Sequence, residues 1–312
     1  PLEGSSKFLN LINNWEHKNK KTPLGGLEID AIAISFSKFE KDNEFNHTEL
    51  INNLNKIIKD NKNKNINLIN FDGAIWNSLG ASLNEEIALM CLSFIEMLRN
   101  NIIDDESQIN FTISLDTDFF LNIAKIRSLR IIINNLYDHF GINPIFKING
   151  RTSDEIIFKE SPWVNQLRIT NAALSAAIAN IDRLTCHHIT NPLGQAPEFV
   201  RRLTRNTHII LQEESNIGKI QDAAGGSYYI ESITKSIADK SFDFIKYVEK
   251  NGGILSLLEN REFINKLSEN KTNKDKMLEE KNIKRIGVNL YPDKEIREIN
   301  IKPYEKINSY DK

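Results

Sequence analysis

The chain has 312 residues, and its 40 basic and 42 acidic side chains give a formal charge of -2. This balance gives no electrostatic reason to expect nucleic acid or an anionic membrane surface as a partner. No apolar run approaches the roughly 18 residues of a membrane span. The two cysteines, Cys91 and Cys186, are far apart in the sequence and indicate neither a disulfide framework nor a metal pair. We therefore expect a protein of the reducing cytoplasm.

Short runs typical of β-strands alternate with longer helical patterns in the first two thirds of the chain. Alternation of this kind favours parallel βα units. The runs are apolar enough for both faces of the sheet to be buried. The predicted strands are residues 28–35, 65–71, 109–115, 144–150 and 182–189.

The helices between these strands carry clear start signals. Ser82 and Glu85 form a capping box, because each side chain can satisfy a backbone N–H of the other residue, and an apolar stripe at helical spacing follows them. Asp118 is placed to cap a second helix, and Ser161-Pro162 supplies a cap and a first-turn proline for a third. Beyond residue 197 the patterns are only helical, over 197–215, 231–253 and a highly charged stretch at 254–285.

This order of elements predicts an α/β fold, a partial or complete (β/α)8 TIM-type barrel followed by a helical C-terminal extension. An open doubly wound sheet is the alternative. A barrel needs eight strands and only about five are visible, so we expect the first strands to be missing from this sequence. The predicted organisation is 1–196 for barrel βα units, 197–291 for the remaining barrel and the helical extension, and 292–312 for a tail.

Individual polar residues do not, by themselves, define a catalytic set. His187 and His188 end the last predicted strand, but neighbouring strand residues point to opposite faces, so at most one of them can face a ligand. His208 lies within a helical pattern and is expected to be packed. Asp116 and Asp118 follow a strand, and the role of helix cap already explains Asp118. The sequence has no H-E-x-x-H, G-x-S-x-G, P-loop or paired C-x-x-C motif.

A charged helix face is predicted in the region after residue 197. Such a face is usually a solvated or ion-paired surface. The two-glycine turn at Gly225-Gly226 lacks a preceding strand and is not a phosphate-binding loop. The residues of the charged face are Arg201, Arg202, Arg205, Glu213 and Glu214.

Several stretches in a fixed order carry a family resemblance. The chain resembles the coenzyme B12-dependent acyl-CoA mutases, specifically methylmalonyl-CoA mutase, over roughly residues 65–291. That family has stretches close to R-N-T-x-x-x-L-x-x-E-S, D-P-x-x-G-S-Y-Y and V-E-x-x-G-G. The matching stretches here are "RNTHIILQEES" (205–215), "DAAGGSYYIESIT" (222–234) and "VEKNGGI" (248–254), supported by "NIAKIRSLR" (122–130) and "IGVNLY" (286–291).

The resemblance places a family site at the turn after the second predicted strand. Catalytic mutase chains read S-G-Y-H-M-Q-E-A-G-A there, and the stretch aligns here on Gly80-Ala81. The family Tyr, close to the migrating radical, corresponds to Ala74, and the family His, which hydrogen-bonds the thioester carbonyl, corresponds to Ile75. The Gln and Glu positions hold Asn77 and Ser78. Ala74 has no aromatic ring to lie beside the radical, and Ile75 has no donor for the thioester carbonyl.

A second site stretch shows the same loss. The family pattern R-T-H-C-Q-T-S-G corresponds to "KINGRTSD" (147–154), so that Asn149 replaces the His and Arg151 the Gln, while Thr152 and Ser153 remain. The family's cobalt-binding D-x-H-x-x-G is also missing, since "YDHFG" has Asp and His adjacent. The resemblance therefore implies that this chain binds no cofactor or metal, and that adenosylcobalamin belongs to a partner chain.

Some mutases pair a catalytic large chain with a homologous small chain that has lost the active-site residues, and this sequence resembles the small chain. The implied role is that of a pseudoenzyme in a heterodimer, a structural partner of the large subunit with no catalytic residue. Ile75 and Trp76 would fill the core. Two alternatives stay open: a divergent mutase or CoA-thioester isomerase that uses residues such as His187, Arg151 or Asp72, and an acyl-CoA-binding module without turnover.

Overall fold

The structure is a computed structural model that describes residues 2–20, 25–42, 47–61, 66–292 and 299–304. Most of the predicted tail, 292–312, lies outside the described residues, as does residue 65 of the predicted strand 65–71. The strands are β1 (Gly25–Ile29), β2 (Ile66–Asp72), β3 (Gln108–Leu115), β4 (Ile145–Thr152) and β5 (Arg183–Thr185).

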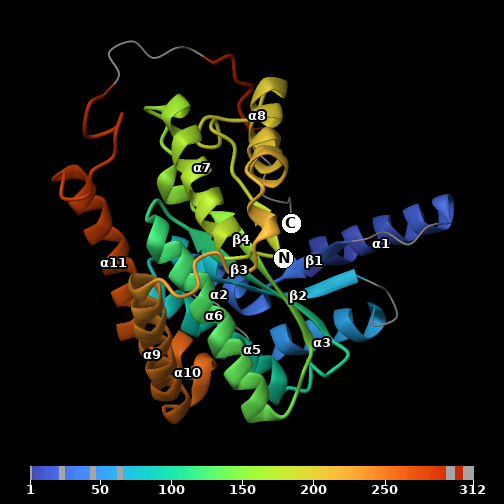
Figure 1. The fold of residues 1–312 in the computed structure, drawn as a ribbon. Coiled ribbons are helices and arrows are strands. Elements are labelled where there is room, and N and C mark those ends of the chain that lie inside the picture. The colour runs from blue at the N-terminus through green and yellow to red at the C-terminus, as the bar shows by residue number, and fades with distance from the viewer. Residues whose placement is uncertain (1, 21–24, 43–46, 62–65, 293–298, 305–312) are drawn as a thin grey trace.

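Helices connect and extend these strands (Figure 1). None of the described helices is long and apolar enough to cross a membrane. In chain order they are α1 (Leu2–Asn19), α2 (Ala31–Asp42), α3 (His47–Asn61), α4 (Gly73–Ser78), α5 (Leu83–Arg99), α6 (Phe119–Phe140), α7 (Pro162–Ile178), α8 (Glu198–Ile209), α9 (Tyr228–Lys250), α10 (Gly253–Glu259) and α11 (Arg261–Glu279).

The strands form one parallel sheet in the order β1-β2-β3-β4-β5. The spatial order follows the chain order, with no reversal of the kind that defines a doubly wound sheet. The sheet is open, so it corresponds to part of a (β/α)8 barrel rather than to a closed one. The fold prediction is confirmed as an α/β partial barrel.

The two faces of the sheet differ in chemistry. On the side covered by α5 and α6, an aromatic cluster joins strands and helices, with Phe71 and Phe111 packed on Phe94, and Tyr137 on Phe146. On the other side, strand residues are polar although they are also buried, as Asn70, Asn110 and Thr112 show. Both faces are therefore buried, as predicted, but only the helix-covered face is apolar.

The first strand prediction is wrong over most of its length. Residues 28–35 were expected to be extended, but β1 ends at Ile29 and α2 begins at Ala31. The carboxylate of Asp30 accepts a hydrogen bond from the Ala33 N–H at 2.9 Å, as a helix cap does. A short apolar run cannot distinguish a buried strand from a buried helix, and here the cap decides for the helix. The last predicted strand, 182–189, shortens to Arg183–Thr185.

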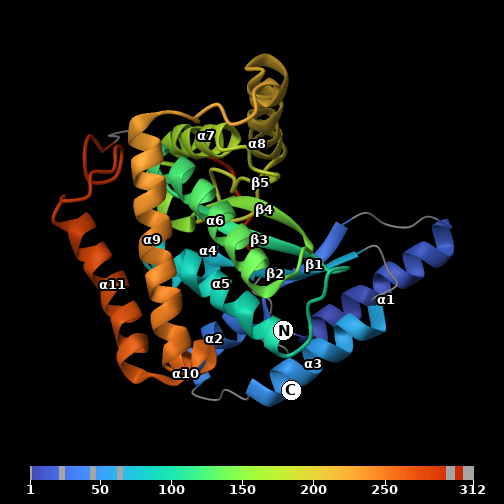
Figure 2. The ribbon, with the colours of Figure 1, turned by 60° about the horizontal axis from the view of Figure 1, so that its bottom comes forward.

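The later helices agree with the prediction and form a further layer. α9 packs along α5 and α6, and α10 packs against α5 and α9 (Figure 2). Predicted caps are present at Asp118, which accepts from the Leu121 N–H, and at Ser82, whose N–H donates to Glu85. α8 is continued by a π-helical turn at Ile210–Glu214.

Candidate functional site

The turn after β2 is built around the carboxylate of Asp72. This carboxylate accepts hydrogen bonds from the N–H groups of Ala74 at 3.0 Å and Ile75 at 3.3 Å, and so caps the short helix α4. The N–H of Asp72 donates to the carboxylate of Asp30 at 2.6 Å. The loop after a parallel strand is where barrel enzymes place their reacting groups, so the turn lies in the expected place.

The side chains that follow Asp72 pack into the protein. Ala74 is buried, and Trp76 is fully buried with its ring 5.3 Å from that of Phe36. Ile75 is half-buried against the hydrophobic core. These residues offer no hydrogen-bond donor or acceptor to a ligand except the indole N–H of Trp76, which is itself buried. Trp76 thus fills the core and Ile75 packs against it, in agreement with what the resemblance implies.

A row of polar side chains crosses four strands just below this turn. Strand register pairs Asp72 with Thr112, Thr112 with Asn149, and Asn149 with Arg183. Residues in register share a face of the sheet. The structure therefore brings together two of the predicted site positions, Asn149 and the turn after Asp72, from strands that are distant in sequence.

Arg151 and Asp72 neutralise each other at the end of this row. The two guanidinium nitrogens of Arg151 donate to the two carboxylate oxygens of Asp72, each at 3.0 Å, in a bidentate pair. Arg183, another member of the row, pairs with Glu28 through a single contact, at 2.5 Å. Both arginines are therefore already bound to a carboxylate within the chain.

Burial shifts the carboxyl groups of this region toward the neutral form. Burial raises the pKa of Asp30 to about 7, although N–H groups of Ala33 and Asp72 oppose the shift. Burial also raises the pKa of Asp72, and the Arg151 guanidinium works against it. The pairing with Arg151 stabilises the charged form of the buried Asp72 side chain.

Asn149 and Asn77, at two further family site positions, have different surroundings. Asn149 is buried, and its side-chain oxygen has no hydrogen-bond partner among the described residues. The side-chain oxygen of Asn77 accepts from the Ser153 hydroxyl at 3.1 Å. That contact ties the turn after β2 to the end of β4. Ser78 is exposed and donates to the backbone oxygen of Ile75.

The two adjacent histidines at the end of β5 serve separate local contacts. His187 faces Asp154 at 3.3 Å, and burial lowers its pKa although Asp154 opposes the shift. His188 contacts the Thr190 hydroxyl at 2.9 Å and the Tyr304 hydroxyl at 3.2 Å. Burial likewise lowers its pKa. Both side chains are therefore held by neighbours, as the structural interpretation of this pair predicts.

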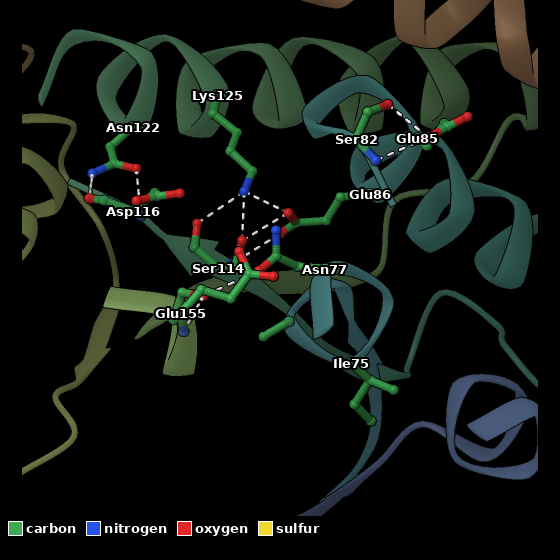
Figure 3. A network of polar contacts seen from close by, with 12 residues as sticks. Ile75, Asn77, Ser82, Glu85, Glu86, Ser114, Asp116, Asn122, Lys125 and Glu155 are labelled. Carbon is green, nitrogen blue, oxygen red and sulfur yellow. Dashed lines mark hydrogen bonds and ion pairs between the residues drawn. The ribbon is translucent and has the colours of Figure 1, made fainter. Parts of the chain in front are cut away.

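A buried charge network that the sequence analysis missed lies at the end of β3. Lys125 donates to the carboxylate of Glu86 at 2.6 Å and to the hydroxyl and backbone oxygen of Ser114 at 2.7 and 2.9 Å (Figure 3). Glu86 also accepts from the N–H and hydroxyl of Ser114, both at 2.7 Å. The available signal was a lysine inside the otherwise apolar "NIAKI" of α6. Because every charge is paired, the network fixes α5, α6 and β3 together.

A surface hollow of about 730 Å³ opens beside this network, between α11 and the first turns of α5 and α6. Two ion pairs lie in its lining: Lys274 pairs with Glu155, and Arg285 lies 3.5 Å from Asp116. Asp118 caps α6, as predicted. His208, the remaining predicted histidine, is half-buried in α8, and burial lowers its pKa.

The arrangement as a whole holds its polar groups in internal pairs. Within the described ranges, no group of three or more His, Cys, Asp or Glu side chains is placed to hold a metal ion. The predicted candidates Asp72 and Arg151 come together, but as an ion pair that satisfies both. Of the site positions, Asn149 keeps a free polar atom, and an amide does no acid–base work near neutral pH.

Comparison with known proteins identifies similar sequences. The model of the family described as methylmalonyl-CoA mutase matches residues 42–311. The chain is 34% identical to a methylmalonyl-CoA mutase small subunit from Propionibacterium freudenreichii subsp. shermanii, over 60% of this chain and 31% of that protein. A small subunit from Streptomyces virginiae is 32% identical over 60% of this chain and 32% of its own length.

A relative without the small-subunit name is also similar. The methylmalonyl-CoA mutase of Escherichia coli K12 is 29% identical over 62% of this chain and 28% of its own length. The chain therefore spans about a third of the length of the curated relatives that it matches.

Proposed function

Because the chain belongs to the methylmalonyl-CoA mutase family, we propose that it acts as the small, non-catalytic subunit of a methylmalonyl-CoA mutase. In this role it is the structural partner of a catalytic large subunit that interconverts methylmalonyl-CoA and succinyl-CoA, and it works in the cytoplasm. The naming of two similar proteins as small subunits supports the proposal.

One observation carries the proposal: the family positions Ala74 and Ile75 hold apolar side chains that pack into the protein, and Arg151 is paired with Asp72. Ile75 packs on the core where the resemblance expects a histidine, and Ala74 is buried where it expects a tyrosine. Arg151, at the family Gln position, is held bidentately by Asp72. A thioester carbonyl placed at this turn would meet no donor from Ala74 or Ile75.

The residues of the chain also do not fit the lower face of cobalamin. Coordination in the family pattern needs a histidine two residues after an aspartate, in a loop. The six histidines are preceded at that distance by Trp15, Phe45, Tyr137, Thr185, Cys186 and Asn206. His139 lies in the last turn of α6. We therefore propose that the large subunit binds adenosylcobalamin and carries out the chemical steps.

The test is reconstitution with a catalytic large subunit of the same family. We expect the two chains to co-purify as a one-to-one complex in size-exclusion chromatography with light scattering. We also expect the isolated chain, supplied with adenosylcobalamin and methylmalonyl-CoA, to form no succinyl-CoA. The double variant D72S/R151Q, which removes the paired charges, should leave the turnover of the assembled complex unchanged within about twofold, because those groups do not face the reacting substrate.

Three results would contradict the proposal. If the two folded chains elute as separate species, this chain is not a structural partner of the large subunit. Succinyl-CoA formation by the isolated chain that is lost in D72S/R151Q would instead favour a divergent isomerase. Binding of an acyl-CoA to the isolated chain without turnover, abolished by a substitution at Asn149, would favour the binding module.

A further inference from the structure

The chain contains two Asn-Gly pairs, Asn149-Gly150 and Asn251-Gly252, which lie in different surroundings. Asparagine is a thermolabile residue. Its side-chain carbonyl carbon can be attacked by the next backbone nitrogen, and the approach is easiest before glycine, which has no Cβ and leaves the backbone free to turn. Both pairs have the same local chemistry, so the fold decides which of them can react.

Strand pairing holds the first pair in place. Asn149 and Gly150 lie inside β4, in register with residues of β3 on one side and of β5 on the other. Asn149 is also buried. The backbone between the two residues cannot turn toward the side chain unless the hydrogen-bond ladders are broken. We therefore expect this pair to be protected in the folded chain.

The second pair lies on the surface at the C-terminal end of α9. Asn251 directly follows the last helical residue, and both it and Gly252 are exposed. The side-chain amide of Asn251 donates to the Tyr247 backbone oxygen at 2.7 Å. The N–H of Gly252 donates to the Glu249 backbone oxygen at 3.4 Å, which is long for a hydrogen bond. Helix ends fray, so these contacts open far more often than a strand ladder does.

We propose that Asn251 is a site of spontaneous deamidation in the folded chain. The Gly252 backbone nitrogen attacks Cγ of Asn251, so that a new C–N bond forms and the bond from Cγ to the side-chain nitrogen breaks. The side-chain nitrogen leaves as ammonia and takes the proton that the Gly252 nitrogen has lost. Water then opens the resulting succinimide at either carbonyl carbon, which gives aspartate or isoaspartate.

The new carboxylate lies in an unfavourable place. It cannot donate to the Tyr247 backbone oxygen as the amide does. It also puts a negative charge at the C-terminal end of α9, where the helix dipole favours a positive one. Two carboxylates already share Arg99 close to this point, because Arg99 pairs with Glu249 and lies 3.5 Å from Glu96. Deamidation therefore adds charge where no further cation is supplied by these pairs.

An isoaspartyl linkage also disturbs the turn between α9 and α10. It lengthens the main chain by a CH2 group where packing is tight, since a Cβ on Gly253 would lie 2.9 Å from a guanidinium nitrogen of Arg99. Beyond this turn, α10 packs against α5 and α9 (Figure 2). We expect the modified chain to hold α10 less firmly than the parent chain.

Ageing of the full chain in buffer, followed by peptide mass spectrometry, tests the proposal. Trypsin releases 148–151 and 251–261, and fragment ions separate Asn251 from Asn260 in the second peptide. We expect Asn251 to convert at least about tenfold faster than Asn149 in the folded chain. Its rate should rise with pH, because the attacking nitrogen must lose a proton. In urea, where the fold no longer distinguishes them, both asparagines should convert at comparable rates.

Two variants test the structural consequence. N251Q keeps a side-chain amide but reacts far more slowly, because the ring that it would form is larger, so its Tm should not change on ageing. N251D reproduces the aspartyl product. It should unfold at a lower temperature than N251Q and show faster hydrogen exchange in α10.

Three outcomes would overturn parts of this inference. If Asn251 stays intact in the folded chain for a time in which it converts in urea, the proposed site is wrong. If Asn149 converts as fast as Asn251 in the folded chain, the argument from strand pairing is wrong. If N251D and N251Q have the same Tm and the same exchange in α10, the loosening of α10 is wrong. The experiment uses no large subunit, so its result is independent of the proposed function.

Discussion

The buried pair of Lys125 and Glu86 makes a strong prediction about stability. Replacing Lys125 with methionine removes the cation that is bonded to the Glu86 carboxylate, and Glu86 is 0% exposed. Glu86 would keep two hydrogen bonds from Ser114 but would lose its countercharge. Removing one partner of a buried pair costs about 3–5 kcal/mol, because the other charge stays buried. We expect K125M to lose that amount in urea unfolding, while K235M on the exposed face of α9 loses less than about 0.5 kcal/mol.

The sign of the pH dependence follows from Glu86. Burial raises its pKa in the folded protein, and loss of the Lys125 charge raises it further. Between the unfolded pKa, about 4.3, and the raised folded value, the folded state binds the extra proton. Stability contributed by this group is therefore complete at low pH and is lost as the pH rises. The deficit of K125M should be smaller at about pH 5 than at about pH 8.

A second substitution separates charge from packing. E86Q keeps the hydrogen bonds with Ser114 but removes the charge, so E86Q/K125M should be more stable than K125M at neutral pH. The coupling energy between the two positions should reach about 2–3 kcal/mol. If K125M loses less than about 1 kcal/mol, or if the two substitutions add without coupling, the reasoning about an uncompensated buried charge is wrong.

Three further substitutions test other parts of the fold. W76A should cost about 3–5 kcal/mol in thermal or urea unfolding because the side chain is fully buried, whereas W163A on the partly exposed surface should cost about 1 kcal/mol or less. D30N should gain stability relative to the parent chain as the pH rises from about 5 to about 8, because burial raises the pKa of Asp30 to about 7; parallel pH curves would contradict this. G80A and G141A both place alanine at positive φ, but only at Gly80 would the added carbon meet a backbone carbonyl of α11, at 2.2 Å. G80A should therefore be less stable than G141A by about 2 kcal/mol or more, and equal losses would count against that contact.

The elements that sequence analysis placed well are those with a cap or a bounded apolar run. The runs at 65–71 and 109–115 are bordered by polar loops and became β2 and β3. The capping box at Ser82 and the cap at Asp118 fixed two helix starts to the residue. The run at 28–35 failed because its decisive residue, Asp30, was treated as part of a strand. Its buried carboxylate instead begins α2, which the pattern of apolar residues could not show.

The partners of the candidate site were harder to predict than its position. The resemblance indicated which positions had changed, but not what the new side chains would contact. Arg151 lies 79 positions from Asp72, and the two side chains meet only because the sheet places the ends of β2 and β4 near each other. Lys125 and Glu86, 39 positions apart, meet because helices α5 and α6 pack side by side. Local sequence patterns predict helices and strands, whereas these ion pairs depend on how distant helices and strands pack together.

The pair of Asp72 and Arg151 connects the changed residues at the family site positions with the stability of the fold. Either charge alone would be costly so close to the sheet, because Asp72 is buried and Arg151 is two thirds covered. Together they satisfy each other, cap α4, and join the ends of β2 and β4. The contact of Asn77 with Ser153 spans the same two strands. In this structure the donors of Arg151 and Ser153 bind other elements of the same chain, which agrees with the structural role proposed above.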